Sequence, residues 1–181
     1  ATTFAKSDAF VLGEQTLRAA TAGDDIELQA SAHLALGRID LIEGRFAAAI
    51  VRFEQALALD PRVPALRARI LTYLGTTLDR SGLSVDAIAP QQEALRLYLE
   101  QGNWQDASAV LANLGNAYSG QGDGEAAREH YQRALALKRE HGITRGVGSV
   151  LNNLADLNVV AGEHEEAAAR LRESIAASSA P

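Results

Sequence analysis

The chain of 181 residues contains no cysteine, which excludes a disulfide framework, a thiolate metal site and a cysteine nucleophile. Proline occurs only four times, and aromatic residues make up 5% of the chain. No apolar run approaches the roughly 18 residues that a membrane-spanning helix requires. The N-terminus, residues 1–4, lacks the basic and apolar regions of a signal peptide. The abundance of alanine instead favours helices packed closely on helices.

Lysine is also nearly absent, because only Lys6 and Lys138 occur. The net charge is −6 and the sequence pI is about 5.2, and no basic residues cluster along the chain. Nucleic-acid-binding domains usually carry a basic face, so we expect no nucleic-acid partner, and we expect no membrane partner. Hydrophobic residues at 47% and charged residues at 22% predict a folded, soluble chain. We expect it to be cytoplasmic.

Four sets of residues recur along the chain in one register, at spacings of 38 to 40 residues. A leucine followed by a small residue occurs four times, as Leu36-Gly37, Leu74-Gly75, Leu114-Gly115 and Leu154-Ala155. Single glycines follow these pairs at Gly44, Gly82, Gly122 and Gly162. Two further sets, of alanine and of leucine or isoleucine, are Ala49, Ala87, Ala127 and Ala167, and Leu57, Leu95, Leu135 and Ile175. Internal repeats of this length predict a solenoid.

Each of the four sets has a structural role. The glycine of the Leu-Gly pair lies in a first helix and lets a second helix approach closely, and the later glycine ends that first helix. The alanine lies where the two helices cross, and the leucine or isoleucine faces the core between repeats. Apolar residues spaced by three and four, such as Phe46, Ala49 and Phe53, support the helical assignment. Each repeat is therefore a helix, a tight turn and a second helix.

The third repeat carries Leu111-x2-Leu114-Gly115-x2-Tyr118 and then Ala127-x3-Tyr131. This resembles the tetratricopeptide pattern W-x2-L-G-x2-Y…A-x3-F, with leucine in the tryptophan position. The longer period and the segment 113–118 are similar to the Leu-Gly-Asn repeat adaptors, and the segment 152–155 is similar to kinesin light chain repeats. The resemblance implies an all-α, right-handed superhelical solenoid of antiparallel helix pairs that binds other proteins.

The register predicts one tetratricopeptide array over residues 1–181. Its parts are 4–22 as the second helix of a partial repeat, then repeats at 27–61, 63–101, 103–141 and 144–177. The expected helices span 4–22, 27–43, 46–59, 63–81, 84–101, 103–121, 124–141, 144–161 and 164–177. The first helix of the N-terminal partial repeat is missing, and no polar capping helix follows the fourth repeat. We therefore expect a fragment of a longer protein that self-associates through its uncapped terminal repeats.

Pro90 interrupts the expected fifth helix, where a proline removes one backbone hydrogen bond. Two interpretations are open. Pro90 can produce a local kink near the start of that helix, or it can be a built-in bend that changes the curvature of the superhelix.

No catalytic motif is present: the sequence has no GxSxG, HExxH or GxxxxGK[ST]. We therefore expect no enzyme activity and no cofactor. No two of the four histidines have the i, i+4 spacing of a helical metal site, so no metal is expected. Asp123-Gly124-Glu125 lacks the other ligands of a calcium loop and is interpreted as the start of a helix. Gly146-x-Gly148 is interpreted as a turn between repeats.

The remaining candidate is the concave groove that first helices line in this architecture. The predicted peptide-binding residues lie at and around the Leu-Gly pairs and are Arg38, Arg69, Tyr73, Thr76, Arg80, Asn113, Asn116, Asn152, Asn153 and Asp156. Asparagine is a poor helix former. The positions of Asn113, Asn116 and Asn153 in the middle of expected helices therefore need an explanation. They either bond to neighbouring helices or hold the backbone of an extended peptide, as asparagines at matching positions do in related repeat families.

The leading hypothesis is a protein–protein interaction module whose groove binds a peptide or partner domain. The arginines would face an acidic stretch of the partner, and the asparagines its uncharged backbone. The carboxylate clamp of chaperone-binding repeats is not met, because Leu34 stands in place of the first basic residue. The alternative is a regulatory or sensor segment of a larger bacterial signalling protein or transcription regulator.

Overall fold

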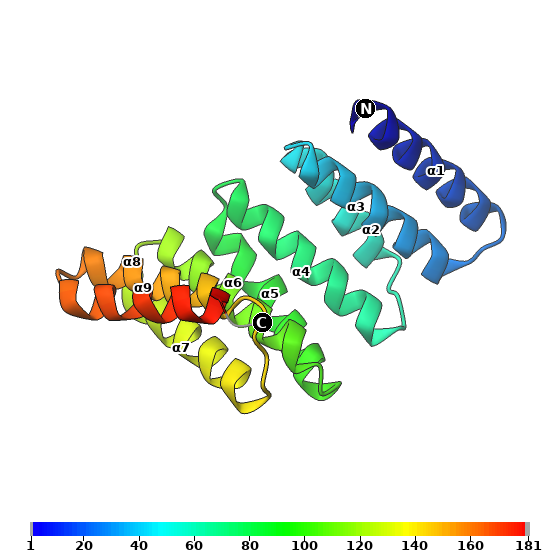
Figure 1. The fold of residues 1–181 in the computed structure, drawn as a ribbon. Helices are drawn as coiled ribbons and strands as arrows, with labels where there is room; N and C mark the ends of the chain where they lie inside the picture. The colour runs from blue at the N-terminus through cyan, green and yellow to red at the C-terminus, as the bar shows by residue number, and fades with distance from the viewer. Residues whose placement is uncertain (1, 180–181) are drawn as a thin grey trace. The chain divides into compact units, whose positions relative to one another are not determined.

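Nine α-helices joined by short turns make up residues 2–179, the backbone that the computed structural model describes; side chains are described for residues 8–177 (Figure 1). The helices are α1 (Thr2–Ala22), α2 (Ile26–Ile42), α3 (Phe46–Ala58), α4 (Pro64–Arg80), α5 (Ser84–Glu100), α6 (Trp104–Gly120), α7 (Gly124–Glu140), α8 (Val147–Val160) and α9 (His164–Ser179). The predicted all-α fold of helix pairs is confirmed. The largest difference from the expected bounds is at α8, which begins at Val147 and not at 144.

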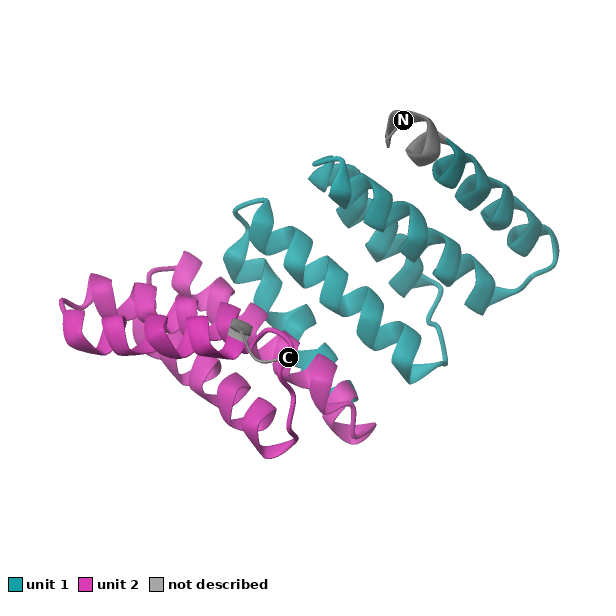
Figure 2. Cartoon of the chain, viewed as in Figure 1, with its two compact units in different colours: residues 1–97 teal, residues 98–181 magenta. Residues whose placement is uncertain are grey.

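The chain divides into two compact units, residues 1–97 and residues 98–181, and the division falls within α5 (Figure 2). In unit 1, α1 packs on α2, α2 on α3 and α3 on α4. In unit 2, α6 packs on α7, α7 on α8 and α8 on α9. Among the described residues, no helix combines the length and apolar character needed to cross a bilayer.

Side-chain caps and positive-φ turns set the helix ends. The carboxylate of Asp123 accepts a hydrogen bond from the N–H of Ala126 at the start of α7, which satisfies one of the unpaired donors there. Asp25 caps α2 in the same way. Gly44 and Gly122 follow first helices at φ +75° and +81°, a conformation that glycine adopts without a steric penalty. The predicted roles of Asp123 and of the turn glycines are confirmed.

The Leu-Gly pairs lie where the two helices of a pair cross. A Cβ atom added to Gly37 would lie 2.6 Å from the ring of Phe53, and one added to Gly115 would lie 2.4 Å from the ring of Tyr131. Neither distance is possible for a real side chain, so only glycine permits these crossings. Ala127, from the predicted alanine set, is fully buried in α7.

The crossing of α4 and α5 differs from the other two, because Gln91 takes the place of the aromatic ring. Its Nε2 donates to the carbonyl of Thr72 and to Oγ1 of Thr76, both at 3.3 Å. Its Oε1 is buried without a hydrogen-bond partner. Pro90 precedes it inside α5, and the helix continues through the proline to Glu100.

The predicted set of leucine and isoleucine residues behaves differently at its end. Leu95 and Leu135 are buried, as expected for residues that face the core between repeats. For Ile175 that prediction is wrong, since 68% of the residue is exposed. The physical reason is that no described helix follows α9 to cover it.

Candidate peptide-binding surfaces

The three arginines predicted as peptide-binding residues in unit 1 are all exposed to solvent. Arg38 comes from α2, and Arg69 and Arg80 come from α4. The guanidinium carbon of Arg38 lies 5.2 Å from the ring centroid of Tyr73, and that of Arg80 lies 5.3 Å from the ring centroid of Phe46. A guanidinium over an aromatic face is held in place while its N–H donors remain available.

The other two predicted residues of unit 1 take part in packing. Tyr73 is half-buried, and its ring stacks on that of Phe53 with centroids 5.9 Å apart. Thr76 is also half-buried, and its hydroxyl accepts a hydrogen bond from Gln91. Tyr73 therefore supports Arg38, and Thr76 supports the crossing of α4 and α5.

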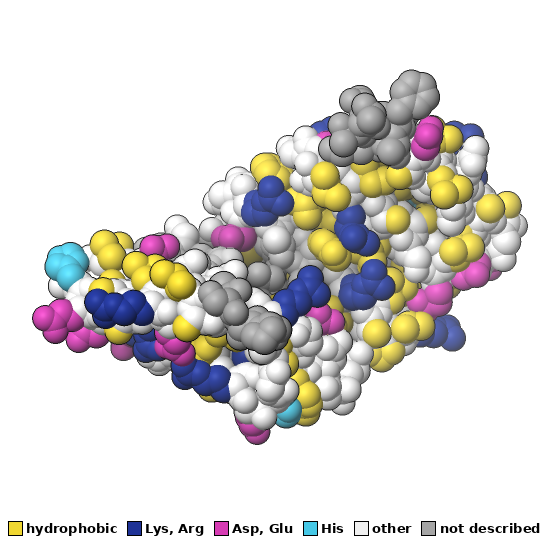
Figure 3. Space-filling view, in the orientation of Figure 1, with side chains coloured by type: hydrophobic (Ala, Val, Ile, Leu, Met, Phe, Trp, Pro, Cys, Tyr) yellow, Lys and Arg dark blue, Asp and Glu magenta, His cyan; other side chains and the backbone are white. Residues whose placement is uncertain are grey.

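A pocket of about 430 Å³ lies between α1 and α2, with Arg38 among its lining residues. Most of its lining is apolar, including Leu12, Leu28 and Ile42. Figure 3 shows basic side chains lying among hydrophobic ones on the face in view.

His33 of α2 is a half-buried histidine of unit 1. Burial lowers its pKa below the ordinary value of 6.5, and Arg52 lowers it further against the opposing effect of Glu14. Arg52 and Glu14 form an ion pair of 2.6 Å beside it, and the Nδ1 atom of His33 is buried without a partner.

In unit 2, three of the predicted asparagines line one pocket of about 240 Å³ between α6 and α8. These are Asn113, Asn116 and Asn153. The Oδ1 atom of Asn116 accepts from the Tyr131 hydroxyl at 2.8 Å and from Nδ2 of Asn153 at 3.0 Å. The asparagine pair therefore ties α6 to α8 and to α7, while its remaining polar groups lie at the pocket.

Asn152 and Asp156, the other two predicted residues of unit 2, are exposed on α8. Neither is among the lining residues of this pocket. The structure thus brings three of the five predicted polar residues of unit 2 together.

Lys138 also lines this pocket, and the sequence reasoning missed it. Only 2% of the residue is exposed, and its Nζ donates to the carbonyl of Arg145 at 2.8 Å. Burial lowers the pKa of Lys138, and the charge of Arg145 lowers it further. Tyr131, Leu135 and Lys138 follow the i, i+4, i+7 spacing of one helix face, so this signal was present in the sequence.

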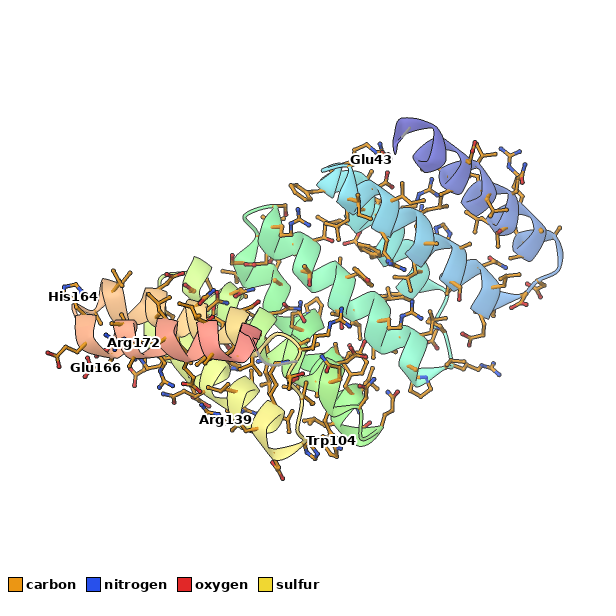
Figure 4. All side chains as sticks on the ribbon, in the orientation of Figure 1. Glu43, Trp104, Arg139, His164, Glu166 and Arg172 are labelled. Carbon is orange, nitrogen blue, oxygen red and sulfur yellow. The ribbon has the colours of Figure 1, made fainter. Side chains whose placement is uncertain are left out.

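Among the described side chains, no three of the residue types that bind metals lie close enough together to hold an ion. His141 stacks on Trp104, which is labelled in Figure 4 at the start of α6. The ring centroids lie 4.5 Å apart, with planes 6° from parallel. This contact connects the end of α7 with the start of α6 and explains both side chains without a ligand.

Helix pairs that recur about every 40 residues, three of them with a glycine at the crossing, define a helical-repeat protein. Sequence models of the tetratricopeptide repeat match residues 34–98 and residues 106–180. The chain belongs to the tetratricopeptide repeat family. These repeats generally mediate protein–protein interactions, and such scaffolds are generally non-enzymatic.

Solved structures with this fold include several repeat proteins. A putative kinesin light chain of Podosopora anserina with nearly identical repeats is 17% identical, with a TM-score of 0.77, over 98% of this chain and 89% of that one. MamA is 19% identical, with a TM-score of 0.73, over 98% of this chain and 91% of that one. BtubC (BKLC) from P. vanneervenii is 21% identical, with a TM-score of 0.76, over 84% of this chain.

The match covers 64% of the BtubC chain, so this chain spans less than two thirds of that protein. At these identities the likeness concerns the fold alone. No curated protein sequence matches the chain.

Proposed function

We propose that this chain is a protein interaction module that binds an extended segment of a partner protein, and that the asparagine pocket of unit 2 holds the backbone of that segment. The observation that carries the proposal is the convergence of Asn113, Asn116 and Asn153 on one pocket of about 240 Å³. An amide both donates and accepts hydrogen bonds, which is what a peptide backbone requires of its receptor.

The hydrogen bonds within unit 2 use only some of the donor and acceptor groups of the asparagine amides. The Oδ1 of Asn116 is used twice within unit 2, and that use holds the side chain in one orientation. Its Nδ2 donates to no described residue. An amide oriented by its neighbours binds a ligand at a smaller entropic cost than a free one.

The exposed arginines of unit 1 supply the second part of the proposal. Arg38, Arg69 and Arg80 attract an acidic stretch of the partner, in a chain whose net charge is −6. The stacked positions of Arg38 and Arg80 reduce the entropy lost when a carboxylate binds them.

The test begins with capture of partners from the source organism and their identification by mass spectrometry. The affinity of the identified segment is then measured for the parent chain, for Asn116→Ala and for Asn153→Ala. Each variant removes one hydrogen bond to the ligand, so we expect a loss of about 2- to 12-fold. The matched control is Asn152→Ala, which changes an exposed asparagine of the same helix outside the pocket.

Thermal unfolding of each variant separates lost binding from lost folding, since Asn116→Ala also removes a partner of the Tyr131 hydroxyl. If folded Asn116→Ala and Asn153→Ala bind the partner as tightly as the parent, the partner uses another surface and the proposal is wrong.

A regulatory segment of a larger signalling protein is the second candidate. It is favoured by the likeness to aspartyl phosphate phosphatase F from Bacillus subtilis, which is 15% identical with a TM-score of 0.77. The match covers 94% of this chain but 49% of that one, so a similar fold makes up about half of that longer bacterial protein. An adjoining nucleotide-binding or helix-turn-helix domain in the parent gene would support this candidate.

A further inference from the structure

The pocket between α6 and α8 contains a buried positive charge at a position built for packing. Lys138 stands 40 residues after Tyr98 in the repeat register, and both residues are at most 3% exposed. Burial of an ammonium group is costly unless it is paired and hydrogen-bonded. A tyrosine-sized apolar side chain would fill the same position without that cost, so packing alone does not account for a lysine.

The protein provides hydrogen-bond acceptors for only some of the N–H donors of the Lys138 ammonium group. An ammonium group has three N–H donors, and one of them donates to the Arg145 carbonyl. No carboxylate among the described side chains pairs with Lys138. Lys138 is among the lining residues of the pocket of about 240 Å³, beside Gly146, where a Cβ atom would already lie in contact with the Lys138 Nζ at 3.5 Å.

The lining of the pocket carries positive charge and no negative charge. Its charged residues are Lys138 and Arg145, and its polar side chains are otherwise amides and one hydroxyl; no aspartate or glutamate is among them. This is unusual in a chain with six more acidic than basic side chains. Gly146 also leaves the first turn of α8 without a side-chain cap, which adds positive potential on the same side.

We infer that this pocket is a receptor for one carboxylate group of the bound segment, which pairs with the ammonium of Lys138 while the asparagine amides hold the adjoining backbone. The inference rests on the proposed function and specifies its ligand. A single buried ammonium matches the single charge of a carboxylate. Because Lys138 lies on α7, the second helix of its pair, the site is distinct from the clamp position at Leu34.

The carboxylate can belong to an aspartate or glutamate side chain or to the C-terminus of a polypeptide. Two libraries of N-acetylated peptides with one position varied at a time separate these sources, the first with free and the second with amidated C-termini. Selection of an acidic residue in both libraries assigns a side chain. Binding confined to the free C-termini assigns the terminal group. Both outcomes support the inference, whereas binding without preference for either group overturns it.

The sharper experiment is a double-mutant cycle between the full chain and the selected peptide. Lys138→Met keeps the length of the side chain and removes its charge, and the peptide is changed from carboxylate to carboxamide at the selected group. We expect Lys138→Met to weaken binding of the acidic peptide by about 10- to 150-fold. The carboxamide peptide should bind the parent and Lys138→Met about equally.

Arg139→Met is the matched control, because it removes the same charge from the next residue of α7, which is exposed (Figure 4). It should change affinity by less than about threefold, as expected of an exposed charge. Lys138→Arg, which keeps the charge in a larger group, should retain part of the carboxylate preference, and it keeps the inference testable if Lys138→Met does not fold.

The outcomes separate this inference from the proposed function. If Asn116→Ala and Asn153→Ala weaken binding but the cycle at Lys138 shows no coupling, the carboxylate receptor is wrong and the peptide-binding function stands. If none of these variants changes affinity, both are wrong. A peptide with a phosphate in place of the carboxylate that binds the parent more tightly overturns the assignment to a carboxylate.

Discussion

The two units of this chain place positive charge in opposite environments. In unit 1, Arg38 and Arg80 are exposed and lie over aromatic rings. In unit 2, Lys138 is 2% exposed and lines a pocket. Exposed charges attract over a distance but are screened by salt beyond about 10 Å. A buried charge is screened little and demands a partner in one position. We therefore expect unit 1 to contribute attraction and unit 2 to contribute selectivity.

The helix crossings of the two units differ as well. At the crossing of α6 and α7, Gly115 faces the rigid ring of Tyr131. At the crossing of α4 and α5, Gly75 faces Gln91, a side chain with several rotatable bonds. Unit 1 therefore combines one crossing against a rigid ring, Gly37 on Phe53, with one against a side chain that has rotatable bonds, whereas the Gly115 crossing of unit 2 is against a rigid ring.

Alanine at each of these glycines tests that difference and has the largest expected effect. Gly115→Ala should destabilise unit 2 by about 1–3 kcal/mol, because the added methyl group overlaps the Tyr131 ring. Gly75→Ala should cost less, because the glutamine side chain can move and alanine favours the helix by about 1 kcal/mol. Urea unfolding of both variants measures this, and equal losses would show that the two crossings are equally rigid.

Salt dependence tests the assignment of attraction to unit 1. Arg69→Ala should weaken partner binding by up to about fivefold at low salt, as expected of an exposed charge worth up to about 1 kcal/mol. The difference should vanish as salt is raised toward about 1 M, where charges are screened within about 3 Å. Arg172→Ala, which changes an exposed arginine of α9, is the control for net charge (Figure 4). A loss that persists at high salt would indicate a desolvated contact instead.

We expect His33 of unit 1 to make the stability of the folded chain depend on pH. Its pKa is lower in the folded chain than the ordinary value of 6.5, so between these two values the unfolded chain binds more protons. Stability should therefore fall as the pH drops below about 6.5 and should be unaffected by this group above it. Thermal unfolding should show a shallower acid loss for His33→Gln than for the parent. Identical profiles for parent and His33→Gln would contradict this.

Weak self-association is the smallest effect that we expect. Leu135 is 3% exposed, whereas Ile175, its counterpart 40 residues later, is 68% exposed, and Val160 nearby in the sequence is 87% exposed. Exposed apolar side chains of this kind favour contacts between like surfaces. Light scattering over a range of concentrations should show an average mass that rises, and Ile175→Glu should reduce the rise. A clean monomer at high concentration would rule the association out.

The spacing of the residues was sufficient to predict most of the fold and to single out three of the residues that line the candidate pocket. The Leu-Gly pairs predicted the crossings because only glycine lets two helices approach so closely, and the turn glycines predicted the helix ends. Asparagines at mid-helix predicted a polar site because their low helix propensity requires compensation. Gln91 was not foreseen, because a glutamine in a helix is ordinary and only its burial makes it exceptional.

The repeat register, the helix pairs and the family follow from the sequence alone, since periodic burial leaves a periodic pattern of residue types. Only the tertiary structure placed Asn116 and Asn153 within hydrogen-bond distance of each other and put Lys138 beside them without an acidic neighbour. A sequence pattern states which face of a helix is buried, but the groups that meet across that face come from three helices, α6, α7 and α8. Their distances are decided by how those helices pack.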